Sequence, residues 1–293
     1  MSTSSGQRPF PIPLVSAMGP GSQIEDEELD YLPMPQGMST YQPPRLPEPD
    51  ALDGHGAAIA VLDQVLAVLQ AAIRGEPVAP VDLSGLGAAD RQIINQALGE
   101  GEVGAQVADG QGGALVQVQE SVFAGVWRVI ERLPDGRLLD RIEVGAIPEV
   151  LKTCARQDGA SGHRPAVRLP ESLMNAPTLL QELHDQRQQW RAGQSAHLVN
   201  LSLLPLSPAD MACLEEQLGM GRVVILSRGY GNCRISSTRV PNTWRVVYYN
   251  SQDAMILNSI EVVDMPEVAC AAPEDMVDSQ QRLREVMAWV NRN

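Results

Sequence analysis

The stretch Leu98-Gly99-Glu100-Gly101-Glu102-Val103 (LGEGEV) returns as LGMGRV at 218–223, 120 residues further along the chain, with the pattern Leu-Gly-x-Gly-x-Val kept. The dipeptide Ala-Asp precedes it both times, at 89–90 and at 209–210. Further matches follow in the same order: Trp127-Arg128-Val129 with Trp244-Arg245-Val246, Ile142-Glu143-Val144 with Ile260-Glu261-Val262, and Pro148-Glu149-Val150 with Pro266-Glu267-Val268. Ordered matches at nearly constant spacing predict two copies of a unit of roughly 118 residues.

Each predicted copy begins with a helix, passes through a short extended segment to a second helix, and ends in four strands. The first helices are expected at 57–74 and 177–192, and in the earlier one apolar residues share one face. Ser207 and Pro208 mark the start of the second helix in the later copy, and Gly99 and Gly219 mark helix ends. Alternating residues predict strands at 102–108, 114–121, 125–133 and 138–145, then 222–228, 233–239, 243–250 and 255–263.

These elements predict an α+β fold built from two tandem copies of a helix-helix-antiparallel meander unit. We expect a Pro-rich acidic N-terminal tail at 1–54, a first copy at 55–152 and a linker at 153–176. The second copy, with a closing C-terminal helix, is expected at 177–293. The tail has too few apolar residues for its own core, so it is expected to be disordered or to act as a strap. Trp127 and Trp244 hold matching strand positions, which favours core packing for both.

Composition limits the class of protein and its partners. Hydrophobic residues make up 44% and charged residues 20% of the chain, as in soluble globular proteins. We find no stretch of about 18 uncharged apolar residues and no secretory signal, so we expect a cytoplasmic protein without direct membrane insertion. The formal net charge of -14 argues against DNA and RNA as partners. The oligomeric state has no signature in the sequence.

The sequence lacks the usual motifs of metal binding and catalysis. Its four cysteines lie far apart, without a C-x-x-C motif, and its four histidines share no ligand spacing (Cys154, Cys213, Cys233 and Cys270; His55, His163, His184 and His197). The pattern G-x-G-x-x-G at 99–104 follows a helix instead of opening one, which argues against a dinucleotide site. We therefore expect no enzyme, no cofactor and no metal.

The most individual stretch is SRGYGNCR at 227–234, which is expected to form a hairpin with a glycine-rich turn. It supplies five candidate partner-binding residues: Arg228, Tyr230, Asn232, Cys233 and Arg234. Two functional interpretations stay open beside the turn. Cys233 beside arginines is a candidate reactive thiol. A basic sheet face that receives an acidic segment is the second interpretation, formed by Arg222, Arg228, Arg234, Arg239 and Arg245.

A second candidate surface lies in the tail. Five acidic residues within 25–30 stand directly before an apolar, methionine-bearing patch. The patch either packs on the protein's own body or docks a partner that presents positive charge beside apolar surface. Its candidate partner-binding residues are Tyr31, Leu32, Pro33, Met34, Pro35, Gly37 and Met38.

Four stretches together carry a resemblance to a known family: 31–40 in the tail, NLSLLPLS at 200–207, SRGYGNCR at 227–234, and Asn242-Thr243-Trp244-x-Val246. From about residue 25 to residue 270 the chain resembles the HupH/HyaF family of NiFe-hydrogenase expression/formation (maturation) proteins.

The resemblance implies a cytoplasmic, non-catalytic accessory protein or chaperone for maturation of an uptake NiFe-hydrogenase. The implied partner is a hydrogenase subunit precursor, with the iron–sulfur small subunit before twin-arginine export favoured, and another maturation factor as a further candidate partner. No catalytic residues transfer with the resemblance. The alternative is a thiol-based redox or iron–sulfur handling protein in the same assembly pathway, which would use Cys233 and the other thiols.

Overall fold

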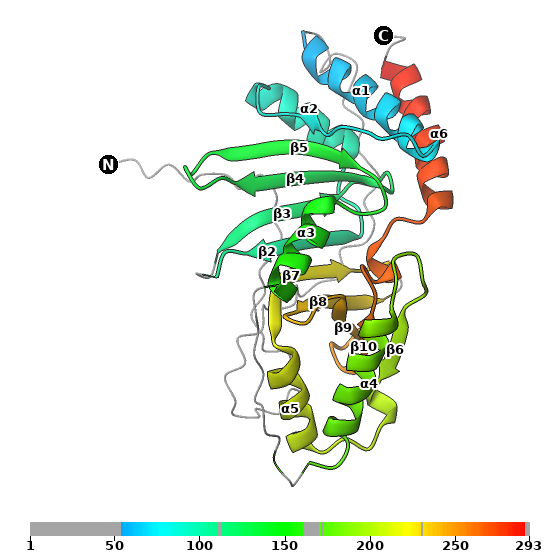
Figure 1. Ribbon diagram of the computed structural model, residues 1–293. Coiled ribbons are helices and arrows are strands. Elements are labelled where there is room, and N and C mark those ends of the chain that lie inside the picture. The colour runs from blue at the N-terminus through cyan, green and yellow to red at the C-terminus, as the bar shows by residue number, and fades with distance from the viewer. Residues whose placement is uncertain (1–53, 111–112, 161–169, 171–172, 230, 291–293) are drawn as a thin grey trace. The chain divides into compact units, whose positions relative to one another are not determined.

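The computed structural model describes residues 54–110, 113–160, 170, 173–229 and 231–290. The chain divides into two units, 1–42 and 43–293, and all described residues belong to the second unit. Ten strands form one antiparallel sheet in the order β1-β5-β4-β3-β2-β7-β8-β9-β10-β6 (Figure 1). The strands are β1 Val81–Asp82, β2 Val103–Ala108, β3 Ala114–Glu120, β4 Val126–Arg132, β5 Leu138–Val144, β6 His197–Asn200, β7 Met220–Ser227, β8 Asn232–Thr238, β9 Thr243–Tyr249 and β10 Met255–Val262.

The helices precede, separate and follow these strands. They are α1 Gly56–Ile73, α2 Ala88–Leu98, α3 Glu149–Ala160, α4 Ala176–Gln189, α5 Pro208–Leu218 and α6 Pro273–Val290, with short 3-10 turns η2 Leu201–Leu203 and η3 Glu267–Ala269. The predicted bounds of the longer strands and of the closing helix agree with these within a few residues. The class α+β is therefore confirmed.

The prediction of two tandem helix-helix-meander units is wrong. All ten strands belong to one sheet, because β2 pairs with β7 along 103–107 and joins the two sets of strands. The short strands β1 and β6 add to β5 and β10 and form the two outer edges. The alternation of residues along a strand indicates that the strand forms, but not which other strand it pairs with. The pairing of β2 with β7 could therefore not be predicted from the sequence.

Helix α3 is a further departure from the sequence-based prediction. It spans residues that were divided between the first predicted unit and the linker. It packs against β7 and β8, and Asp158 near its end accepts hydrogen bonds from the backbone N and Nε of Arg222 at 2.7 and 2.6 Å. The sequence 149–160 was missed because Gly159 and several polar residues weaken its helical pattern.

Local capping signals were predicted correctly. Ser207 is the N-cap of α5, and its hydroxyl accepts a hydrogen bond from the backbone N–H of Asp210. Gly99 and Gly219 end α2 and α5 with φ of 58° and 62°, a conformation that favours glycine. Gly101 has a separate reason, because a Cβ there would collide with the Ser121 carbonyl. The glycine pattern at 99–104 therefore serves a helix end and a close backbone approach.

The helices cover both faces of the sheet. Arg128 of β4 donates to Asn95 of α2, and Arg245 of β9 donates to Glu215 of α5, so these two helices lie on the same face. Helix α3 lies on the other face. Helix α6 packs on α1 and on the β3–β4 connection, where the Ala124 N–H donates to Ser279 Oγ at 2.8 Å. Helices and sheet together enclose the apolar side chains.

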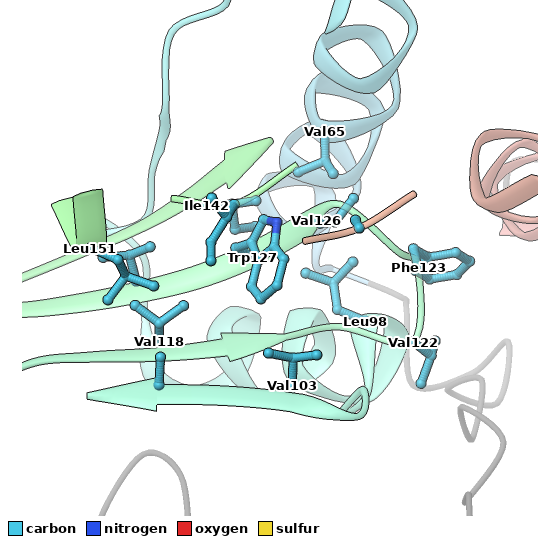
Figure 2. Packing of buried hydrophobic residues seen from close by; sticks show 14 of the residues in the cluster. Val65, Leu98, Val103, Val118, Val122, Phe123, Val126, Trp127, Ile142 and Leu151 are labelled. Atoms are coloured by element: carbon cyan, nitrogen blue, oxygen red, sulfur yellow. The ribbon is translucent and has the colours of Figure 1, made fainter. Parts of the chain in front are cut away.

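The main core extends across the centre of the sheet. It contains side chains of the first strands, such as Val103 and Trp127, together with Ile225 and Trp244 of the later ones. Trp127 and Trp244 are 0% and 1% exposed, which confirms the predicted core role. Figure 2 shows Trp127 among apolar side chains from several strands and helices, including Leu151 of α3. A smaller cluster lies between α4, α5 and the β6–β10 edge.

Helix α1 corrects one expectation from composition. By length and apolar composition alone, its 18 residues could cross a membrane, although the sequence analysis found no such stretch. In the structure Leu62, Val65 and Leu69 are buried in the main core, and α1 packs against α6. Here the apolar residues of α1 contribute to the protein core.

A buried ion pair ties β4 to β5. Arg128 Nε and Nη2 donate to the two carboxylate oxygens of Asp140 at 2.7 and 2.6 Å, and the side chains are 6% and 10% exposed. Arg137 and Asp135 form an ion pair of similar length in the β4–β5 turn, but there the side chains are 77% and 51% exposed. The two pairs differ mainly in burial.

We predict that Arg128→Ala lowers the free energy of unfolding by about 3–5 kcal/mol, because it leaves the Asp140 carboxylate buried without its cation. Arg137→Ala is the matched control and should change stability little, since water replaces the lost partner. Urea denaturation of both variants measures the difference. An equal loss of unfolding free energy in the two variants would show that burial does not determine how much the Arg128–Asp140 pair contributes to stability.

Glu120 at the end of β3 is a buried acid. It is 8% exposed and accepts a hydrogen bond from the Gly125 N–H at 3.2 Å. Burial, assisted by the nearby charges of Glu102 and Asp275, raises its pKa from 4.5 to about 7. Because the folded state holds this proton more tightly than the unfolded state, stability falls as pH rises from about 4.5 to about 7.

We predict that Glu120→Gln raises the free energy of unfolding at pH 8 by about 3 kcal/mol, since the amide needs no ionisation at that pH. The gain should shrink as pH falls below 7 and vanish below 4.5. Denaturation curves between pH 4 and 8 test this, with exposed Glu274→Gln as control. A gain of the same size at every pH would contradict the ionisation argument.

Candidate functional site

The predicted hairpin at 227–234 is present between β7 and β8, but its candidate residues are separated. Cys233 pairs with Ser227 and Arg234 with Leu226, so the side chains of Cys233 and Arg234 lie on opposite faces of the sheet. Both are buried, at 2% and 7% exposure. Arg228 and Asn232 are partly buried. Cys233 and Arg234 therefore do not belong to one exposed surface patch.

Several candidate residues lie outside the described part of the chain. These are Tyr230 at the hairpin tip and all seven tail residues, Tyr31, Leu32, Pro33, Met34, Pro35, Gly37 and Met38. Their role in binding a partner stays a prediction.

The cysteines occupy environments that oppose thiolate formation. Burial raises the pKa of Cys233 to about 12, and the charge of Glu261 acts in the same direction against the hydrogen bond from Tyr248. Burial raises the pKa of Cys270 to about 11, and the pKa values of Cys154 and Cys213 are also raised by burial. Among the described residues no three His, Cys, Asp or Glu side chains are grouped closely enough to hold a metal ion. This geometry does not favour the reactive-thiol interpretation.

Two of the arginines expected on one basic sheet face have acidic partners on different helices. Arg222 is bonded to Asp158 of α3, and Arg245 Nη1 donates to Glu215 of α5 at 2.6 Å. Since α3 and α5 cover opposite faces of the sheet, these two guanidinium groups point to different sides. Arg234 pairs with Val247 and so lies on the same face as Arg245, but it is 7% exposed. The five arginines therefore do not form one exposed basic face for an acidic segment.

The largest group of exposed apolar side chains at the sheet lies along its β6–β10 edge. Strand β6 pairs with β10, and η2 continues beside the earlier part of β10, where the Asn258 N–H donates to Ser202 Oγ at 2.8 Å. We call this surface the apolar edge, and its members are Leu198, Leu203, Leu204, Met255 and Ile256, which are 37–80% exposed. Exposed apolar groups of this kind mark interaction sites on soluble proteins.

Glu261 lies on β10 next to the apolar edge. It pairs with Leu198 of β6 on one side and with Trp244 of β9 on the other, so these three side chains share one face. Glu261 is 9% exposed, and its carboxylate makes no hydrogen bond or ion pair with any residue that the structure describes. Burial raises its pKa, and the charge of Glu267 adds to the effect. An acidic residue that is mostly buried and has no cation beside it is an unusual feature.

Few features of the sequence predict this surface. Leu203 and Leu204 stand in the stretch NLSLLPLS at 200–207, where Pro205 follows an uninterrupted apolar run. Leu198 and Ile256 look like ordinary strand residues, because sequence periodicity does not tell which strand forms an edge. Glu261 was noticed only as a match to Glu143, which is ion-paired with Arg141 at 2.8 Å in the structure.

Comparisons with known proteins agree over nearly the whole chain. A family model described as HupH hydrogenase expression protein, C-terminal conserved region, matches residues 56–166 and 173–290. The curated hydrogenase expression/formation protein HoxQ of Cupriavidus necator is 53% identical over 281 residues, which cover 96% of this chain and 98% of that protein. Hydrogenase expression/formation protein HupH of Rhodobacter capsulatus is 45% identical, with coverage of 95% and 97%.

More distant matches carry related names. Hydrogenase-1 operon protein HyaF of Escherichia coli is 33% identical over 93% of this chain and 95% of its own length. The solved structure of hydrogenase expression protein HupH from Thiobacillus denitrificans is 30% identical and covers 39% of this chain and 95% of its own, with a TM-score of 0.37. With matches on both sides of residues 167–172 and full-length relatives above 40% identity, the chain belongs to the HupH family of hydrogenase expression proteins.

Proposed function

We propose that this protein is a non-catalytic accessory protein in the maturation of an uptake NiFe-hydrogenase. It acts in the cytoplasm by holding a subunit precursor, and the favoured precursor is the iron–sulfur small subunit before twin-arginine export. The observation that carries this proposal is the 53% identity over 96% of the chain to a hydrogenase expression/formation protein.

A holding role requires apolar surface that a client can cover. The apolar edge supplies such a surface, since its five large side chains are exposed at the border of the sheet. The buried side chains of α1, Trp127 and Trp244, in contrast, belong to the main core and are not accessible to a client. The apolar edge is therefore the described surface that best fits a client-binding role.

Charge supports the choice of the small subunit. The chain has a formal net charge of -14, and the acidic run 25–30 stands beside the apolar residues 31–38. A twin-arginine signal is basic at one end and apolar next to it, so its charge pattern is complementary to this stretch. Acidic charge would speed the encounter, and apolar burial would supply much of the affinity.

The thiol-based alternative is less well supported by the geometry. Burial raises the pKa of Cys233 to about 12, which leaves little thiolate at neutral pH for redox chemistry or iron–sulfur transfer. Metal analysis separates the two functions. Stoichiometric iron that survives gel filtration and is lost in Cys233→Ser would favour the alternative, whereas an adaptor should hold no iron through Cys233.

Direct capture tests the proposed function. Purified protein is mixed with the purified small-subunit precursor, with the same precursor lacking its signal, and with the large subunit, and the complexes are separated by gel filtration. The small-subunit precursor should co-elute with the protein. Another maturation factor that joins the complex would be recovered when the capture is repeated from cells. Failure of every subunit to bind would contradict the holding role.

We predict that deletion of residues 1–40 leaves the melting temperature of the protein nearly unchanged but lowers hydrogenase maturation. Residues 43–293 form one compact unit, so the body should fold without the deleted segment. Added salt should slow association of the full-length protein more than it speeds dissociation, because charge acts mainly on the encounter. A melting temperature well below that of the full chain would show that the tail is a structural strap.

A further inference from the structure

The two edges of the sheet differ in how far they are protected against further strand pairing. Edge β1 has only two residues, includes Asp82 and follows Pro80. Short length, charge and proline are the usual ways in which proteins block an edge. Edge β6 has four residues, His197–Asn200, and carries neither proline nor an Asp, Glu, Lys or Arg residue. The β6 edge is therefore less protected than the β1 edge, although it is also short.

The outer side of β6 is open within the described part of the chain. β6 is the last strand in the sheet order, and its described strand partner is β10 (Figure 1). In an antiparallel pair, alternate residues of an edge strand direct their N–H and C=O groups outward. Leu198 is 52% exposed beside these groups. An extended peptide could therefore form main-chain hydrogen bonds and apolar contacts at the same place.

Glu261 indicates the charge of such a peptide. The Glu261 residue is 9% exposed, its carboxylate has no hydrogen-bond or ion-pair partner among the described residues, and its oxygens are not fully enclosed. It lies one strand inward from Leu198 on the same face. Neighbouring strands are about 4.8 Å apart, so a peptide on β6 would be two strands from Glu261. A Lys or Arg side chain reaches that far by lying along the Leu198 side chain.

We propose that β6 is a docking strand for an extended segment of the hydrogenase subunit precursor. The segment adds to the sheet beside β6, its alternate apolar side chains pack on the apolar edge, and one Lys or Arg side chain reaches Glu261. The inference rests on the proposed function, and it names the site and the chemistry of the client. A second copy of this chain is a poorer occupant, because two molecules with a formal charge of -14 repel each other.

The chain contains a matched control for the docking strand. Leu138 begins β5 beside the protected β1 edge and is 56% exposed, compared with 52% for Leu198. Replacement of either leucine by Lys places the same charge on an edge of the same sheet. Leu198→Lys should weaken capture of the purified small-subunit precursor about tenfold or more, and Leu138→Lys should leave it unchanged. Both variants should melt close to the unaltered protein, since both side chains are exposed.

A second pair of variants tests the role of Glu261. Glu261→Gln should reduce affinity for the precursor and weaken its salt dependence, without lowering the melting temperature, because the buried carboxylate has no described partner to lose. Glu143→Gln is the control, since Glu143 lies opposite Trp127 as Glu261 lies opposite Trp244, but is bonded to Arg141. It should leave precursor binding unchanged.

The possible results separate this inference from the proposed function. If the precursor binds and Leu198→Lys has no effect, the docking strand is wrong and the holding function stands. If the precursor does not bind, the function fails for the small subunit, and overlapping 15-residue peptides from both subunits decide the inference. Binding of a basic, apolar peptide that depends on Leu198 and Glu261 supports the docking strand, and binding of none overturns it. A dimer that Leu198→Lys converts to monomer would assign the edge to a second copy instead.

Discussion

The fold depends on the antiparallel pairing of β2 with β7. This pairing aligns Ala105 with Ile225 and Val107 with Val223, and all four side chains lie in the main core. Without it, two five-stranded sheets would each expose a long apolar strand at the edge, which is a site for unspecific association. The pairing also brings α3 onto β7 and β8, because the connection from β5 passes over the joined strands. One interface between strands thus fixes the sheet, the core and the position of α3.

Most local elements could be predicted from the sequence, whereas their assembly could not. The capping box at Ser207, the glycines at 99 and 219, and the alternation along β2 and β3 depend on residues close in sequence. The β2–β7 pairing joins residues more than about 115 positions apart, and internal similarity says nothing about which strands become neighbours. The similar stretches were therefore assigned to separate units although their strands share one sheet. Helix α3 was missed because it is held mainly by tertiary contacts such as Asp158 with Arg222.

The candidate site was harder to predict than the fold, because exposure depends on the sheet order. The stretch 227–234 is a predicted partner-binding site because of its rare residue types, but strand alternation places Cys233 and Arg234 on opposite faces. Leu198 and Glu261 have common residue types and acquire their significance only from being next to each other at an edge. Family resemblance, by contrast, was visible from the sequence, since it rests on runs of residues and not on three-dimensional placement.

An exposed apolar edge has to bind a client without causing self-association of the protein. Two features of the β6 edge make this possible. The strand is only four residues long, so main-chain pairing alone gives a weak complex, and affinity must come from side chains. Those side chains discriminate by charge. A basic segment meets the carboxylate of Glu261 on the neighbouring strand β10, whereas the β6 strand of a second molecule carries no Lys or Arg and adds a net charge of -14. The cost of burying Glu261 without a cation lowers the stability of the free protein. A cation supplied by the client removes that cost, so binding energy is available at this edge that a neutral partner would not obtain.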